Sequence, residues 1–144
     1  STTFLEPLLP DAGVLTERVP SEGEQQSIDY GFRIARELGR LDLGQSVVVC
    51  DGACVALEAM EGTDAVIRRA ASLVNGKDLA VVKLARPDQD PRFDVPVVGP
   101  DTLTTMVESK VTAPAVEARK TLMIDREELI HTADENNITI VAVE

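Results

Sequence analysis

Short apolar segments alternate with longer amphipathic segments along this 144-residue chain. The apolar segments, such as Leu79–Leu84 and Ile138–Val143, have the length of strands, and segments with helical periodicity, such as Ala65–Val74, separate them. Aromatic residues are scarce, so Val, Leu, Ile and Ala must build the core. We therefore predict an α/β fold: a mixed β-sheet with helices packed against it and at least one β-hairpin.

Local signals mark the ends of the expected elements. Ser21 with Glu24, and Asp125 with Glu128, predict capping boxes at the starts of two helices, and Thr63 is predicted to cap a third. The expected helices cover residues 22–38, 65–74, 100–109 and 126–135. The expected strands cover residues 47–50, 54–60, 79–84, 113–118, 121–124 and 138–143. The inner side of the first helix is predicted to carry Ile28, Phe32, Ile34 and Ala35.

Residues 1–20 contain three prolines among scattered apolar residues. They are predicted to form an extended lead-in or linker rather than a packed element, which leaves residues 21–144 as one domain. Cys50 and Cys54 flank the turn signal Asp51-Gly52 and are expected to face each other across a hairpin. Two buried thiols are the favoured interpretation there, and a disulfide is the alternative.

The net charge of −11 argues against a nucleic-acid partner and against spontaneous binding to an anionic membrane surface. No apolar run reaches the length of a transmembrane segment, and nothing resembles a signal peptide. We therefore expect a soluble, cytoplasmic protein. With two cysteines and one histidine, His131, the chain has no zinc ligand set and no nucleophilic triad. We expect His131 to be a solvated surface residue.

Two acid-bearing segments follow strands and are candidates for a site. In Glu58–Asp64, Gly62 lets a backbone approach a ligand, and Thr63 and Asp64 lie where a helix N-terminus offers free amides to an anion. An ordinary strand-to-helix junction is the favoured interpretation of that segment taken alone. The second segment, Lys83–Pro96, contains three acids and three bases, which are Asp88, Asp90, Asp94, Lys83, Arg86 and Arg92.

Carboxylates that converge suit Mg²⁺, and interleaved Arg and Lys suit phosphate oxygens. Composition alone favours a surface loop whose charges pair with one another. Loops beyond strand ends are, however, where α/β sheets place ligands, so the two segments together are able to assemble one site. Any hydrolysis there would be water attack helped by a metal and a carboxylate.

Five segments, in their order and spacing, resemble one family. They are G-V-L-T at Gly13–Thr16, R-I-A-R-E-L-G-R-L-D-L-G-Q at Arg33–Gln45, E-A-M-E-G-T-D at Glu58–Asp64, K-L-A-R-P-D-Q-D-P-R-F-D-V-P-V-V-G at Lys83–Gly99, and A-V-E-A-R-K-T-L-M-I-D-R-E at Ala115–Glu127. Through them the chain resembles the C-terminal domain of the UDP-2,3-diacylglucosamine pyrophosphatases of some Gram-negative bacteria. Each segment is moderately specific, and the set is very specific.

The resemblance implies Mg²⁺-assisted hydrolysis of UDP-2,3-diacylglucosamine to UMP and 2,3-diacylglucosamine 1-phosphate (lipid X), a step of lipid A synthesis. It implies Asp90 as the essential carboxylate, with Asp94 and Asp64 as supporting ligands or water-orienting groups. The implied metal ligands are Asp90, Asp94 and Glu61. The residues implied in substrate binding are Lys83, Arg86, Gln89, Arg92, Thr63 and Gly62.

The chain departs from the family in two respects. Family members carry an N-terminal, Rossmann-like domain, and lipid X lies between the two domains; nothing in this sequence matches that domain. The chain alone is therefore expected to hold part of the site and to have little activity. The family usually has glycine where this chain has Arg119, in a turn between two strands. A left-handed conformation there would cost an arginine about 1 kcal/mol.

The resemblance also sets the expected partners. They are UDP-2,3-diacylglucosamine, lipid X and the family's N-terminal domain, with transient peripheral contact to the inner membrane because the substrate is a lipid. The sequence leaves a homo-oligomer open. Two other classes of function remain: a module that binds a phosphorylated metabolite or a lipid phosphate without turnover, and a structural or oligomerisation domain. The resemblance ranks the hydrolase first.

Overall fold

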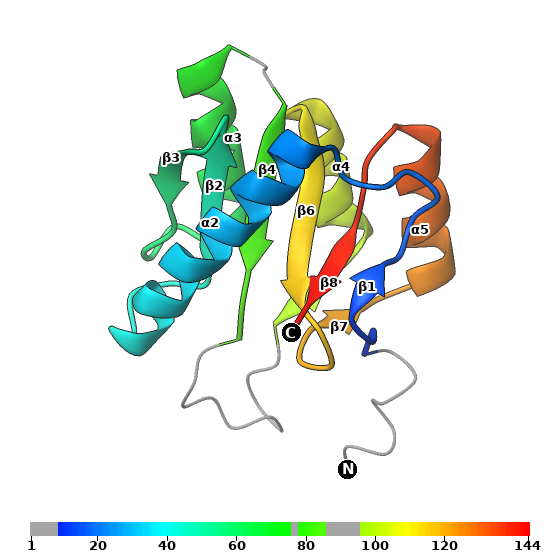
Figure 1. Ribbon diagram of the computed structural model, residues 1–144, viewed down its shortest axis with the longest axis horizontal. Coiled ribbons are helices and arrows are strands. Elements are labelled where there is room, and N and C mark those ends of the chain that lie inside the picture. Colours follow the sequence, from blue (N-terminus) through cyan, green and yellow to red (C-terminus); the bar gives the residue numbers. More distant parts are fainter. Residues whose placement is uncertain (1–8, 76–77, 86–95) are drawn as a thin grey trace.

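A six-stranded mixed sheet forms the centre of the structure, a computed structural model that describes residues 9–75, 78–85 and 96–144 (Figure 1). The strand order is β1-β8-β6-β4-β2-β3. Strands β4, β6 and β8 are mutually parallel, and β1, β2 and β3 join through antiparallel pairs. The strands are β1 (Gly13–Val14), β2 (Ser46–Cys50), β3 (Ala53–Leu57), β4 (Leu79–Lys83), β6 (Val111–Glu117) and β8 (Val141–Val143). The predicted fold class is confirmed.

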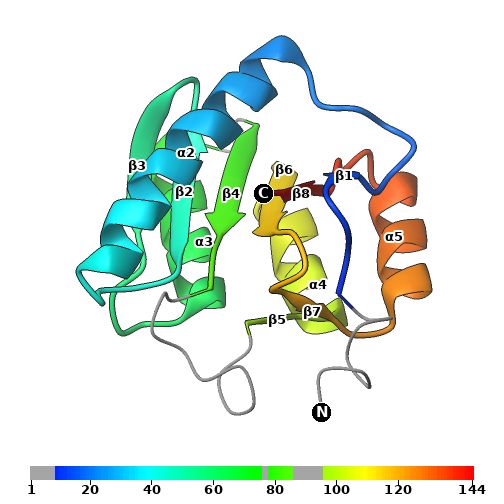
Figure 2. The same cartoon turned by 60° about the horizontal axis from the view of Figure 1, so that its bottom comes forward.

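Helices cover both faces of this sheet (Figures 1 and 2). Helix α2 (Glu22–Arg40) packs on one face through Ile28, Phe32 and Ala35, and Ile34 is partly buried there, which confirms the predicted inner side. The opposite face carries α3 (Thr63–Val74), α4 (Pro100–Glu108) and α5 (Arg126–Glu135). Residues that alternate along β2 and β4 point into one or the other of the two cores, as expected for buried strands.

A second, two-stranded parallel sheet lies beyond the end of the main one. It pairs β5 (Val97–Val98) with β7 (Leu122–Met123). The sequence predicted the strand around β7 but not β5. The backbone amide of Leu122 donates to the carbonyl of Pro96 at 2.8 Å, so this small sheet fixes the chain that enters α4 beside the end of β6.

Strands β2 and β3 form the predicted hairpin around Asp51-Gly52. Cys50 is buried and Cys54 is exposed, so the expectation of two buried thiols is wrong for Cys54. The prediction that the two cysteines face each other is also wrong, because a bulge next to Val49 places Cys54 opposite Val49 and Cys50 opposite Ala53. Both cysteines are thiols.

Two of the three predicted caps are wrong. The capping box of Ser21 and Glu24 is present in both directions. Asp125 precedes α5 in a left-handed conformation (φ 52°) and makes no side-chain cap. Thr63 is the first helical residue of α3 rather than its cap, and Gly62 is the N-cap with φ 92°. At Asp125 the left-handed backbone directs the side chain away from the amides that a cap must reach, and at α3 the cap position falls on a glycine, which has no side chain.

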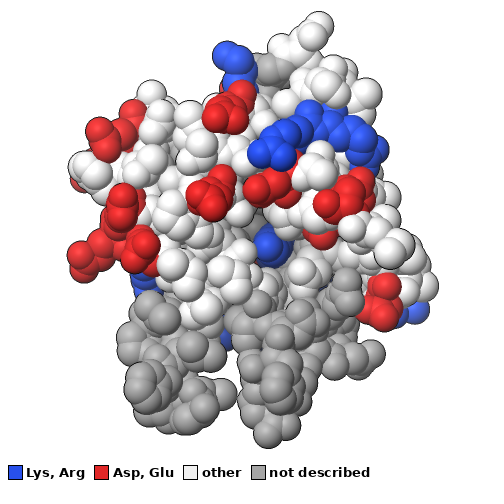
Figure 3. All heavy atoms as spheres, turned by 180° about the vertical axis from the view of Figure 1, so that it is seen from behind, with Lys and Arg blue, Asp and Glu red and all other residues white. Residues whose placement is uncertain are grey.

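Charged side chains are interspersed on the face that α3, α4 and α5 form (Figure 3). Acidic groups are scattered over this face, and the basic groups do not join into one continuous surface, which agrees with the net charge of −11. His131 is exposed and contacts Glu135 at 3.0 Å, as predicted for a solvated residue. None of the helices in the described ranges is both long enough and apolar enough to cross a bilayer.

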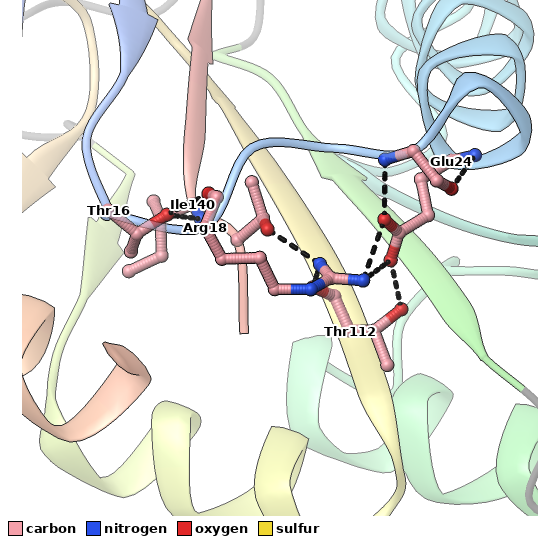
Figure 4. Close-up of polar contacts among 7 residues, drawn as sticks. Thr16, Arg18, Glu24, Thr112 and Ile140 are labelled. Carbon is pink, nitrogen blue, oxygen red and sulfur yellow. Dashed lines mark hydrogen bonds and ion pairs between the residues drawn. The ribbon is translucent and has the colours of Figure 1, made fainter. Parts of the chain in front are cut away.

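The segment before α2 is packed, so the expectation of an unpacked lead-in is wrong for residues 13–18. Strand β1 pairs with β8, and the Thr16 hydroxyl accepts from the Ile140 amide at 3.2 Å. Arg18 donates from Nη2 to both carboxylate oxygens of Glu24, at 2.9 and 3.1 Å, and from Nη1 to the Thr139 hydroxyl at 2.6 Å (Figure 4).

We call the contact between Arg18 and Glu24 the Arg18–Glu24 clamp. The Thr112 hydroxyl also donates to Glu24, at 2.5 Å, and Arg18 contacts the Thr112 carbonyl at 3.3 Å. Thr112 lies near the start of β6 and Thr139 precedes β8. The clamp therefore fastens the N-terminal segment and α2 to the amino ends of the parallel strands.

Candidate active site

Four strands end at the same edge of the main sheet. Strands β4, β6 and β8 run parallel, and β3 has the same direction because two antiparallel pairs separate it from β4. Lys83 ends β4, Glu117 ends β6 and Leu57 ends β3. We call the edge of the sheet at which these strands end the carboxyl edge. Both acid-bearing segments singled out in the sequence begin here, because each of them starts at or just after the end of one of these strands.

Lys83 is the predicted substrate-binding base that the structure describes, and it lies at the carboxyl edge. Its side chain is half-buried, and Nζ donates to the Val97 carbonyl at 3.1 Å, the one hydrogen bond of this ammonium within the described ranges. Burial lowers the pKa of Lys83, and the negative charges of Glu58 and Asp64 act against that decrease. Lys83 from one predicted segment and Asp64 from the other thus lie within electrostatic reach.

Thr63 and Ser46 form a polar contact next to Lys83. Ser46 begins β2 and is the Cα partner of Lys83 in the ladder between β2 and β4. Its hydroxyl lies 3.2 Å from the Thr63 hydroxyl, which donates to Glu58 Oε1 at 3.4 Å. The predicted role of Thr63 in substrate binding stays a prediction, since in this structure its hydroxyl is used within the protein.

Glu61 and Gly62 shape the turn before α3. Glu61 Oε1 accepts from the Ala59 amide at 2.7 Å, and Oε2 pairs with Arg69 at 3.3 Å. The hydrogen bond from Ala59 is the main reason why the pKa of Glu61 is lowered. These contacts fasten the turn, and Gly62 supplies the positive φ that admits the chain into α3. The prediction that Glu61 binds metal stays a prediction.

Glu117 lies beside the point where the second segment leaves β4. Its Oε1 accepts from the Ala85 amide at 3.0 Å, and Oε2 lies 3.5 Å from Lys120 Nζ. It therefore fixes the chain directly before residue 86. The other predicted site residues, with Asp88, lie outside the described residues; they are Arg86, Gln89, Asp90, Arg92 and Asp94.

Oxygen donors for a magnesium ion are only partly present in the described part of the chain. Asp64 and Glu58 are carboxylates at the carboxyl edge, but no three His, Cys, Asp or Glu residues within the described ranges gather closely enough to hold a metal ion. The donor chemistry suits Mg²⁺. A full ligand set would require Asp90 and Asp94.

Sequence reasoning missed three residues of this site: Ser46, Glu58 and Glu117. Glu58 and Glu117 lie in segments that carried the family resemblance, but nothing in their spacing assigns a role to them. Ser46 offers no signal at all, because its partner Thr63 is 17 residues away and is reached through the sheet. Their contacts depend on strand pairing.

The segments with the family resemblance all lie within the part of the chain that a known family covers. The sequence model of the LpxI C-terminal domain family matches residues 11–141. The chain belongs to the LpxI C-terminal domain family. The resemblance noted in the sequence is therefore confirmed, and the match begins within the segment expected to be a lead-in.

A curated relative supports this assignment. The UDP-2,3-diacylglucosamine pyrophosphatase LpxI of Caulobacter vibrioides is 37% identical over 139 residues, which cover 92% of this chain and 50% of the relative. This chain therefore spans about half the length of that relative.

Among solved structures, one similar chain is a diaminohydroxyphosphoribosylaminopyrimidine deaminase/5-amino-6-(5-phosphoribosylamino)uracil reductase from Thermotoga maritima. It is 15% identical, with a TM-score of 0.47, over 83% of this chain and 36% of that chain. A likeness of this size carries no argument about function.

Proposed function

We propose that this chain is the part of a UDP-2,3-diacylglucosamine pyrophosphatase that carries the hydrolytic residues. The observation that carries the proposal is the 37% identity to a protein of that name over nearly the whole chain. The carboxyl edge supports it, because Lys83, Asp64 and Glu58 are the kinds of groups that bind and hydrolyse a diphosphate.

The reaction consumes one water molecule. The water oxygen attacks one phosphorus atom of the diphosphate, the bond from that phosphorus to the bridging oxygen breaks, and UMP and 2,3-diacylglucosamine 1-phosphate leave. We assign to Asp64 the orientation of the water or the acceptance of its proton, and to the Lys83 ammonium the neutralisation of a phosphate oxygen; the charge of Asp64 acts on Lys83, which supports this pairing. We assign the essential carboxylate to Asp90, with Arg86, Gln89 and Arg92 as further phosphate contacts.

We propose Mg²⁺ as the cofactor, held by Asp90 and Asp94. When bound, it would polarise the diphosphate and offset its negative charge. The net charge of the chain is −11, so a phosphate-rich substrate needs local positive charge, and Lys83 is one of the described residues that supply it at this edge.

Because the substrate is a lipid, we place the reaction at the cytoplasmic side of the inner membrane, with peripheral rather than spanning contact. We also propose that the half of the family protein that this chain does not match completes the site. Self-association of the chain is compatible with this arrangement and is measured directly by sedimentation.

The test is release of UMP from UDP-2,3-diacylglucosamine by the chain supplied together with the other half of the family protein. Lys83→Met keeps the apolar stem and removes the charge, and we expect kcat/KM to fall by roughly 10²–10³. Lys110→Met is the matched control, since Lys110 is exposed and directly precedes β6, at the opposite edge of the sheet.

Asp90→Asn is expected to abolish turnover, and unchanged turnover in that variant would remove Asp90 from the mechanism. Binding of UMP or lipid X without metal, with no hydrolysis in the complete protein, would favour a binding module instead.

A further inference from the structure

Glu58 has no role in the predictions from sequence, yet two hydrogen bonds tie it to the site. Its amide donates to the Ser46 carbonyl at 2.9 Å. Its carboxylate accepts from the Thr63 hydroxyl at 3.4 Å, and that hydroxyl contacts Ser46 Oγ at 3.2 Å. Ser46 is fully buried and is the cross-strand partner of Lys83. Glu58, Thr63 and Lys83 therefore meet around one buried serine.

The direction of these hydrogen bonds follows from the number of protons. A threonine hydroxyl has one proton to donate, and an ionised carboxylate only accepts. Thr63 must use its proton on Glu58, so Ser46 must donate to Thr63. The resulting chain of donors runs from the buried serine outward and ends on the Glu58 carboxylate.

The backbone of Glu58 is also fixed in place. A Cβ atom added to Gly44 would lie 1.9 Å from the Glu58 carbonyl oxygen, so the loop before β2 packs directly against this residue. With the backbone held by Ser46 and Gly44 and the side chain held by Thr63, the carboxylate has little freedom to leave the carboxyl edge.

We propose that Glu58 is a positioning residue for Lys83: its carboxylate, held by the Thr63 hydroxyl, is the fixed counter-charge that keeps the Lys83 ammonium charged at the carboxyl edge. The use of that ammonium on a phosphate oxygen rests on the proposed function. Among the residues that the structure describes, Glu58 and Asp64 are the ionisable groups whose charges act on Lys83, and both oppose the effect of burial on its pKa. Of these two, Glu58 is the one anchored to a neighbouring strand.

The test measures the protonation of Lys83 itself. Each lysine of the folded chain is acylated over a range of pH, and the rate at each position is read by mass spectrometry. Glu58→Gln removes the charge and keeps the shape. We expect the midpoint of the Lys83 profile to move to lower pH, with labelling near neutral pH faster by roughly three- to tenfold. Lys110 and Lys120 in the same sample should keep their profiles.

The shape of the profile separates charge from loosening of the structure. A loss of counter-charge moves the midpoint and leaves the plateau at high pH unchanged, whereas greater exposure of Lys83 raises the plateau. Thr63→Val is a second variant that should move the midpoint in the same direction, because the carboxylate loses its donor. Thr63→Ser and Glu58→Asp should restore most of the original profile.

An unmoved midpoint in both Glu58→Gln and Thr63→Val would overturn the proposal, even if the protein hydrolyses its substrate. A midpoint that moves supports the positioning role of Glu58 whether or not the protein hydrolyses its substrate. The hydrolysis assay alone tests the proposed function, so a failure of either proposal is distinguished from a failure of the other. If the enzyme is active, Glu58→Gln should lower kcat/KM more at pH 9 than at pH 7, where Lys83 is more fully protonated. An equal decrease in kcat/KM at both pH values would contradict the proposal that Glu58 acts through the charge of Lys83.

Discussion

Arg119 holds a left-handed backbone, with φ of 60°, in the turn after β6. Its guanidinium pairs with Glu144, an exposed contact of small value. Both Arg119→Gly and Arg119→Ala remove this pair, but only glycine avoids the steric cost of a Cβ in that conformation. We expect Arg119→Gly to be more stable than Arg119→Ala by about 1 kcal/mol in urea unfolding. Greater stability of the alanine variant would contradict the left-handed turn.

Gly44 lies very close to another backbone segment. An added Cβ would lie 1.9 Å from the carbonyl oxygen of Glu58, which is a backbone atom whose residue is hydrogen-bonded to Ser46. We expect Gly44→Ala to lower the free energy of unfolding by about 3 kcal/mol, since the overlap is with backbone rather than with a flexible side chain. Gly23→Ala is the control: Gly23 lies in α2 with open space around it, so alanine there should be neutral or stabilising.

At the level of elements, the start of α2 depends on Glu24. Burial alone would raise the pKa of Glu24, but hydrogen bonds from Ser21, Thr112 and Arg18 together hold it below its ordinary value of 4.5. Because the folded-state pKa is depressed, the stabilisation is present above the unfolded pKa and is lost as pH falls through the folded pKa.

We therefore expect Glu24→Gln to be less stable than the parent chain by about 2 kcal/mol at pH 7. The difference should shrink as pH falls below 4.5. Denaturant unfolding at several pH values measures it. Glu22→Gln, another first-turn acid of α2, should show a small difference at every pH. A difference for Glu24→Gln that does not change with pH would mean that the ionised carboxylate is not the stabilising form.

The elements also show what local sequence is able to predict. The capping box of Ser21 and Glu24 was correct because both partners lie within one turn. The one expected at Asp125 failed because the backbone there is left-handed, a property that depends on the chain around it. Strands β1 and β5 have two residues each, too few for a pattern, and exist because β8 and β7 pair with them.

Some residues of the candidate site were also predicted from local sequence, whereas others were missed. Lys83 and Asp64 were predicted because each belongs to a charged segment that begins at or just after the end of an apolar strand, and strand direction brings the two segments to one edge. Ser46 and Glu58 were missed because their contacts cross from strand to strand, where the register of β2 decides which side chains meet. Sequence patterns located the edge, and the pairing of strands determined its hydrogen bonds.

At the level of the whole molecule, folding and metal binding should be separable. The two cores contain apolar side chains, and no group of three metal-ligating residues occurs within the described ranges. We expect removal of divalent cations with EDTA to leave the melting temperature unchanged while it abolishes turnover in the complete protein. A melting temperature that falls on metal removal would show that the cation also stabilises the fold.

The Arg18–Glu24 clamp and Lys83 lie at opposite ends of the parallel strands, separated by the length of β6, roughly 20 Å. Substitutions that far apart, with no shared partner, add their effects independently. Substitutions at the Arg18–Glu24 clamp can therefore change the heat or acid stability of a descendant protein without altering the residues around Lys83 at the carboxyl edge.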